Sequence, residues 1–165
     1  MIQPQFELTD DHGRPVTIEV YTGQYLLVFF GFTHCRVVCP RALSKLSEVL
    51  GVLKQRYGEQ AEIIQPLYIS VDPERDSPEV MLQFLQNNYP LFTGLTGTQE
   101  QVEAAKQAFH VFAQKKPDDE DPAGYAVPHT AFTYLLDQQG HYLYHYPDHW
   151  DVSRMVDDLT LRIIN

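Results

Sequence analysis

Hydrophobic residues recur along the chain with two periods, one typical of strands and the other typical of helices. A continuous run of aromatic and aliphatic residues at 25–30 predicts a strand that is covered on both faces. Alternating residues at 6–9 and 16–18, separated by turn residues at 10–15, predict an N-terminal β-hairpin. Pro66 lies within the next apolar run and predicts a break or a sheet edge there. Further strands are expected at 63–71, at 130–136 and, after a turn at 137–140, at 142–146, with a short strand within the loop 91–97.

Apolar residues at helical spacing predict helices between these strands. The first helix is expected to start at Pro40, because proline is favoured at the first helical position, and to end near Tyr57. Ser77 is expected to cap a second helix that also begins with a proline, Pro78. The remaining helices are expected at 99–109 and 151–163.

The order of these elements is hairpin, β, α, β, α, α, β, β, α. A βαβ unit followed by a β-hairpin and a closing helix is the layout of a thioredoxin-like fold, an α/β fold whose central mixed β-sheet is flanked by helices. The 165 residues suffice for one domain with a single sizeable core, and no repeat or internal linker divides them. We therefore expect a single thioredoxin-like domain over residues 1–165.

The composition is acidic, with 22 Asp and Glu residues against 12 Lys and Arg and a formal net charge of −10. Such a surface repels phosphate groups, so nucleic acid is not an expected partner. The chain contains no run of about 18 apolar residues and no charged-then-apolar leader, which predicts a soluble domain without membrane contact of its own. A removed anchor or signal ahead of Met1 stays open.

Both cysteines of the chain, Cys35 and Cys39, lie where the strand 25–30 gives way to the first helix. The loop that they would close is too small to stabilise a fold as a disulfide, so a functional site is the expected purpose. With Pro40 at the first helical position, Cys39 is the expected N-cap. The unpaired N–H groups of the helix start and the charge of Arg36 favour its thiolate form.

Two chemistries fit this pair of thiols. Three residues separate them, instead of the two of the Cys-x-x-Cys oxidoreductase motif, and this spacing permits a disulfide but also opens room for a metal ion. Two thiolates alone prefer Cu(I), an added imidazole supports either copper state, and a structural zinc normally needs four protein ligands. A peroxidase needs a Thr three residues before its reactive Cys, whereas Thr33 stands two residues before Cys35. Incidental burial of both thiols is the remaining alternative.

A third ligand would have to be a histidine that folding brings close to the thiols. His129 stands at the start of the strand 130–136, and in a thioredoxin-like sheet the loop entering this strand packs against the cysteine turn, so we expect its imidazole to reach the thiols. His34 adjoins the first cysteine and is expected to point away from the site. His141 and His145 share one strand face and His149 follows, which is typical of a solvated hairpin face or a weak accidental metal patch.

The residues around these positions resemble the Sco/SenC copper-chaperone family of thioredoxin-like proteins. The match extends over nearly the whole chain and in the same order. Its pieces are Phe6-Glu7-Leu8-Thr9 with Gly13, Phe30-Gly31-Phe32-Thr33-His34-Cys35 through Cys39-Pro40, Val71-Asp72-Pro73-Glu74-Arg75-Asp76-Ser77-Pro78, and Tyr125-Ala126-Val127-Pro128-His129-Thr130 leading to Tyr134-Leu135.

This resemblance implies one copper ion per chain, Cu(I) or Cu(II), held by Cys35, Cys39 and His129. It implies a domain that faces the bacterial periplasm or an equivalent compartment, membrane-tethered in the full-length protein. Its role would be to assist assembly of the CuA centre in cytochrome c oxidase subunit II, or of another copper protein, as a metallochaperone and not a turnover enzyme. Some members of the family act instead as reductants of the target's cysteines. The alternative function is therefore a thiol:disulfide oxidoreductase that uses the Cys35/Cys39 pair.

The chain departs from the family pattern at two places. Arg36-Val37-Val38 replaces the usual Pro-Asp-aliphatic sequence, and Pro128 replaces the acidic residue often found before the histidine. The more positive site favours thiolates but weakens the support of a bound copper ion, so the redox alternative gains ground. Pro128 is also a candidate for a cis peptide bond that faces the cysteines. The segment 72–78 is interpreted as a turn and helix cap without a catalytic role. The acidic segment 115–124 is interpreted as an exposed loop, with a partner-docking surface as the alternative.

Overall fold

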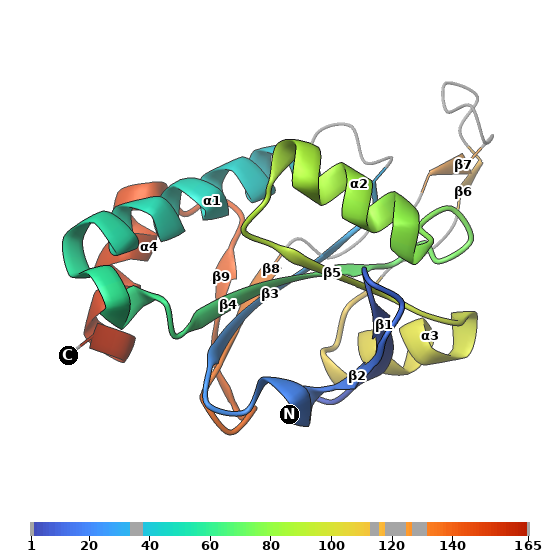
Figure 1. Ribbon diagram of the computed structural model, residues 1–165, viewed down its shortest axis with the longest axis horizontal. Coiled ribbons are helices and arrows are strands. Elements are labelled where there is room, and N and C mark those ends of the chain that lie inside the picture. The colour runs from blue at the N-terminus through green and yellow to red at the C-terminus, as the bar shows by residue number, and fades with distance from the viewer. Residues whose placement is uncertain (1, 34–37, 113–115, 118–124, 127–131, 165) are drawn as a thin grey trace.

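The computed structural model describes residues 2–33, 38–112, 116–117, 125–126 and 132–164. Within them, one seven-stranded mixed sheet crosses the molecule in the order β2-β1-β5-β4-β3-β8-β9, with helices on both of its faces (Figure 1). Its strands are β1 (Glu7–Asp10), β2 (Pro15–Thr17), β3 (Tyr25–Gly31), β4 (Ile64–Ser70), β5 (Thr93–Thr96), β8 (Phe132–Leu136) and β9 (Tyr142–Pro147). The helices are α1 (Val38–Tyr57), α2 (Pro78–Asn88), α3 (Gln99–Ala108) and α4 (Val152–Leu159). Short turns of other helical types are η1 (Ile18–Tyr21), η2 (Gly58–Ala61) and η3 (Thr160–Ile164).

The strand directions confirm the predicted thioredoxin-like layout. β3, β4 and β5 run parallel, whereas β8 pairs antiparallel with β3 and β9 pairs antiparallel with β8. The N-terminal hairpin of β1 and β2 is also confirmed, and it joins the sheet because β1 pairs with β5. The short strand expected within 91–97 is β5, the link that makes this extension possible.

The continuous apolar run of β3 is buried on both faces because helices cover both sides of the sheet. Leu27 and Phe29 face the core under α1, α2 and α4, whereas Leu26, Val28 and Phe30 face the core under α3. Figure 1 shows α1, α2 and α4 above the sheet and α3 below it. β3 thus carries apolar residues on both faces because it lies between two hydrophobic cores.

Pro66 lies inside β4, one of the central strands, so the predicted break or sheet edge at this residue was wrong. The hydrogen bond from Val71 N to Gly31 O shows that the odd-numbered residues of this strand direct their main-chain groups toward β3. The nitrogen of Pro66 therefore faces β5, whose pairing with β4 begins only at Leu67. The missing N–H costs no ladder hydrogen bond there, and Gln65 Nε2 donates to Pro66 O at 2.8 Å.

Helix α1 begins at Val38, and Cys39 lies in its first turn instead of forming the N-cap, so this part of the prediction was wrong. A proline is tolerated throughout the first turn because the N–H groups there have no helical acceptor. Pro40 therefore indicates the first turn but not its first residue. The cap predicted for α2 is confirmed, because Ser77 Oγ accepts a hydrogen bond from Val80 N at 3.2 Å.

The predicted exposed loop at 115–124 is only partly described. Two of its residues form a strand, β6 (Lys116–Pro117), which pairs antiparallel with β7 (Tyr125–Ala126), and the rest of the loop lies outside the described residues. The strand expected at 130–136 is confirmed from Phe132 onward.

None of the helices in the described part of the chain has the length and apolarity that spanning a membrane requires.

Candidate metal centre

Three residues form the predicted centre, and the structure describes the main chain of only one of them, Cys39. Cys39 belongs to the first turn of α1 through its main chain. Cys35, His129 and the proposed cis candidate Pro128 lie outside the described residues, as does His34. The ligand set therefore stays a prediction, and the described residues test whether its surroundings fit.

The ends of three strands bring the segments that carry the predicted ligands to one edge of the sheet. Phe29 in β3 pairs with Thr133 in β8, and these two strands run in opposite directions. The carboxyl end of β3, which leads toward Cys35, therefore lies beside the amino end of β8, which follows His129. Because β4 runs parallel to β3, the loop that follows β4 begins at the same edge.

A buried carboxylate, that of Asp76, connects this loop to the end of β3. Asp76 has no exposed surface. Its Oδ2 accepts from Thr33 N at 3.1 Å, and its Oδ1 accepts from Thr33 Oγ1 at 2.5 Å. Ser70 Oγ, at the end of β4, also donates to Asp76 Oδ2 at 2.7 Å. One carboxylate thus binds both donors of the residue that stands two positions before Cys35.

Burial raises the pKa of Asp76, and the negative charge of Asp72 adds to this effect. The hydrogen bonds from Thr33 and Ser70 act in the opposite direction, because they stabilise the ionised form. The neighbouring guanidinium of Arg75 is engaged elsewhere: it forms an ion pair with Asp72. The pKa of Asp76 is raised overall, because desolvation outweighs the hydrogen bonds that the carboxylate accepts.

Arg75 also places a positive charge against Phe32, the first residue after β3. Its guanidinium carbon lies 5.5 Å from the centre of the Phe32 ring, and both residues are largely buried. A cation over an aromatic face is a favourable contact, and it stabilises the packing of the segment that follows β3. Together, Arg75 and Asp76 anchor Phe32 and Thr33.

The interpretation of 72–78 as a turn and helix cap was therefore incomplete. The cap at Ser77 is present, but the preceding Asp76 also binds Thr33 at the end of β3. The sequence offered two signals, an acidic residue next to a Ser-Pro cap and the place of 71–78 among the motifs that resemble the Sco/SenC family. The burial of Asp76 depends on strand ends that meet from distant parts of the chain, which sequence spacing does not reveal.

The other histidines do not form a competing centre in the described part of the chain. His145 is packed among aromatic rings, and its Nδ1 lies 2.5 Å from Tyr142 Oη. His141 is 79% exposed and lies beside Asp137. Among the described side chains, one group of three places metal-donor atoms close together, and it lies in the N-terminal hairpin turn: Asp10, Asp11 and His12. Its carboxylates are already engaged, one by Arg14 and the other by the main-chain N–H of Gly94.

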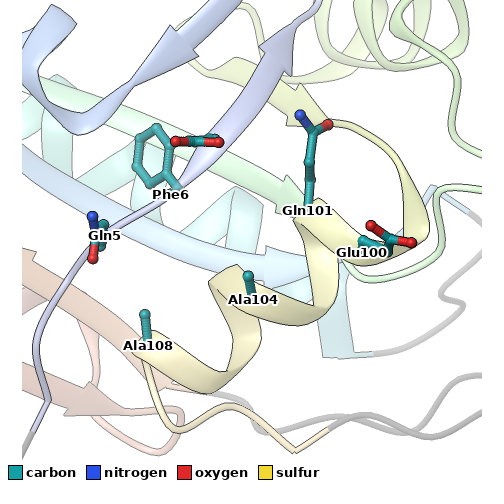
Figure 2. A pocket seen from close by; sticks show the side chains of 7 residues that line it. Gln5, Phe6, Glu100, Gln101, Ala104 and Ala108 are labelled. Atoms are coloured by element: carbon teal, nitrogen blue, oxygen red, sulfur yellow. The ribbon is translucent and has the colours of Figure 1, made fainter.

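A pocket of about 370 Å³ opens between β1 and α3. Figure 2 shows Ala104 and Ala108 along α3 on one side of it and Phe6 on the other. The described residues that line it are Gln5, Phe6, Glu7, Glu100, Gln101, Ala104 and Ala108, and none of these is a cysteine or a histidine.

Comparison with known proteins shows the same family over the whole length of the chain. The model of the SCO1/SenC family matches residues 1–163. A SCO2-like protein of Rickettsia prowazekii is 37% identical over 141 residues, which are 86% of this chain and 67% of that protein. The mitochondrial SCO2 homolog of Homo sapiens is 39% identical over 158 residues, 96% of this chain and 57% of its own length. The chain thus spans little more than half of the human relative.

Solved structures agree with the sequence matches. Arabidopsis thaliana ScoI with copper bound superimposes with a TM-score of 0.92 at 29% identity, covering 99% of both chains. Bradyrhizobium japonicum ScoI with copper bound gives a TM-score of 0.84 at 35% identity, covering 98% of this chain and 99% of that one. The resemblance inferred from the motifs is thereby confirmed, and this chain belongs to the SCO1/SenC family.

Proposed function

We propose that this protein is a copper-binding assembly factor that holds one copper ion per chain through Cys35, Cys39 and His129. The observation that carries the proposal is its likeness to copper-bound relatives over almost the entire chain. The meeting of the β3 and β8 ends at one sheet edge supports it, because these ends lead to the cysteines and the histidine.

The proposed donor set suits copper on chemical grounds. Thiolates are soft ligands that select Cu(I), and one added imidazole completes a three-coordinate site or supports Cu(II). A closed zinc site would need a fourth protein ligand. The position of Cys39 in the first turn of α1 favours its thiolate form, because unpaired N–H groups and the positive end of the helix dipole lie there.

Delivery would proceed by ligand exchange, with copper as the cargo. Thiolates and imidazoles of the acceptor would replace the ligands of this chain one at a time, so that the ion never leaves a coordinated state. Cytochrome c oxidase subunit II, which carries the CuA site, is the proposed acceptor, and another copper protein is the alternative. We also propose that the domain works in the bacterial periplasm or an equivalent compartment, tethered to the membrane in the full-length protein.

Anaerobic titration of the reduced protein with Cu(I), in competition with a chelator, tests the binding proposal. We expect one tight equivalent per chain, lost in Cys35→Ala. In His129→Ala the affinity should fall by more than about tenfold, the loss typical of removing even an outer-shell partner. His141→Ala is the matched control, because His141 is exposed on the distant hairpin. Absence of tight binding in the wild type would contradict the proposal.

A thiol:disulfide oxidoreductase is the second candidate, favoured by Arg36 and Pro128, which make the site more positive than the family pattern does. One cysteine thiolate would attack a partner disulfide, and the second would resolve the mixed disulfide. The partner gains two thiols and this chain is left with a Cys35–Cys39 disulfide. Reduction of a disulfide-containing acceptor should then proceed equally in wild type and His129→Ala. A strong loss in His129→Ala would count against this candidate.

A further inference from the structure

We infer that Asp76 is a positioning residue of the dithiol centre: through Thr33 it holds the chain segment that leads to Cys35, and it thereby sets the copper affinity and the reduction potential of the thiols. The part of this inference that concerns copper affinity rests on the proposed function. The reduction potential of the two thiols requires no copper, so it tests the same inference independently.

The contacts of Asp76 reach the carboxyl ends of three parallel strands. Its side chain accepts from Thr33, after β3, and from Ser70, at the end of β4. Its main-chain oxygen accepts from Thr96 Oγ1, at the end of β5, at 2.7 Å. Since Asp76 and Thr96 are both buried, these bonds are protected from competition with water. Of these bonds, only the side-chain contacts with Thr33 join this loop to the segment that leads to Cys35, whereas the contact with Thr96 joins its main chain to β5.

The contact with Thr33 constrains two degrees of freedom at once. The main-chain N–H and the side-chain hydroxyl of Thr33 both donate to the carboxylate of Asp76, one to each oxygen. The main chain and the χ1 rotamer of Thr33 are therefore held together, two residues before Cys35. Residues that orient a metal ligand without touching the metal influence metal affinity, because a preorganised site loses less conformational freedom on binding.

The same Thr→Val substitution at two hydroxyl donors to Asp76 separates a positioning role from general stabilisation of the fold. Thr33→Val removes the hydroxyl that donates to the carboxylate, on the side of the dithiol. Thr96→Val removes the hydroxyl that donates to the main-chain oxygen of the same aspartate. Thr33→Ser keeps the donor and serves as the conservative rescue. Asp76→Asn keeps the shape but replaces one accepting oxygen with a donor group.

We expect Thr33→Val and Asp76→Asn to lower the Cu(I) affinity about tenfold, and to shift the potential of the Cys35–Cys39 couple measured by equilibration with glutathione buffers. Thr33→Ser and Thr96→Val should keep the wild-type affinity and potential, although Thr96→Val should lower the thermal midpoint. If Asp76→Asn does not fold, the Thr33 variants decide the question alone.

The inference is overturned if Thr33→Val keeps both the affinity and the potential of the wild type, or if Thr96→Val changes them as much as Thr33→Val does. A wild type that binds no Cu(I) tightly would contradict the proposed function but not this inference. In that case a shifted potential in Thr33→Val, absent in Thr33→Ser and Thr96→Val, would still support the positioning role of Asp76.

Discussion

Two buried aspartates, Asp10 and Asp76, have pKa values that are shifted in opposite directions. At Asp10 burial raises the pKa, but it is outweighed by hydrogen bonds from the main-chain N–H groups of Arg14 and His12 and by the guanidinium of Arg14, so the pKa is lowered overall. At Asp76 the donors are neutral side chains and one N–H, and burial dominates. At Asp10, two main-chain N–H bonds and the Arg14 guanidinium together outweigh desolvation, whereas at Asp76 desolvation, aided by the charge of Asp72, outweighs three neutral donors.

The lowered pKa of Asp10 predicts a stability contribution that depends on pH. A carboxyl whose pKa is lower in the folded state stabilises the fold above its unfolded value of 3.8, and this contribution is lost as the pH falls through the folded value. Asp10→Asn should therefore cost about 1–3 kcal/mol at pH 7, and the cost should shrink at pH 3. Urea denaturation at both pH values measures it, with exposed Glu62→Gln as the control. An equal cost at both values would refute this assignment.

Three helices begin at residues whose side chains accept hydrogen bonds from the main chain of the first turn. Thr98 and Gln101 form a reciprocal capping box at the start of α3, and Asp151 Oδ1 accepts from Arg154 N at the start of α4. Such local caps can be predicted from the sequence, as the cap at Ser77 was. The place of Pro66 inside β4 could not be predicted from the sequence, because it depends on where the pairing with β5 begins.

Two glycines in different elements predict opposite effects of the same substitution. A Cβ added to Gly94, in β5, would lie 3.0 Å from Leu85 Cδ1 and 3.1 Å from Met81 Cβ, both on α2. Gly94→Ala should therefore destabilise the fold by about 1–3 kcal/mol, as overpacking does. A Cβ added to Gly51, inside α1, would meet nothing within 4 Å. Gly51→Ala should stabilise by up to about 1 kcal/mol. Thermal unfolding of both variants tests this, and a stabilised Gly94→Ala would contradict the packing of α2 on β5.

At the scale of the whole molecule, the sheet and its helices were predictable because hydrophobic period distinguishes strands from helices. The dithiol junction was predictable for the same reason, since both cysteines follow the buried run of β3. The start of α1 was missed, because a proline is accepted at several positions of a first turn. Asp76 was missed as a support of the junction, because its contacts join residues 33, 70 and 96 across three strands.

The ligand set itself, Cys35, Cys39 and His129, remains the central prediction. X-ray absorption spectroscopy at the copper edge, on protein loaded anaerobically with one equivalent of Cu(I), tests it most directly. We predict two sulfur scatterers and one imidazole nitrogen, with the nitrogen lost in His129→Ala and retained in His141→Ala. A copper environment without sulfur, or one that His129→Ala leaves unchanged, would contradict the account.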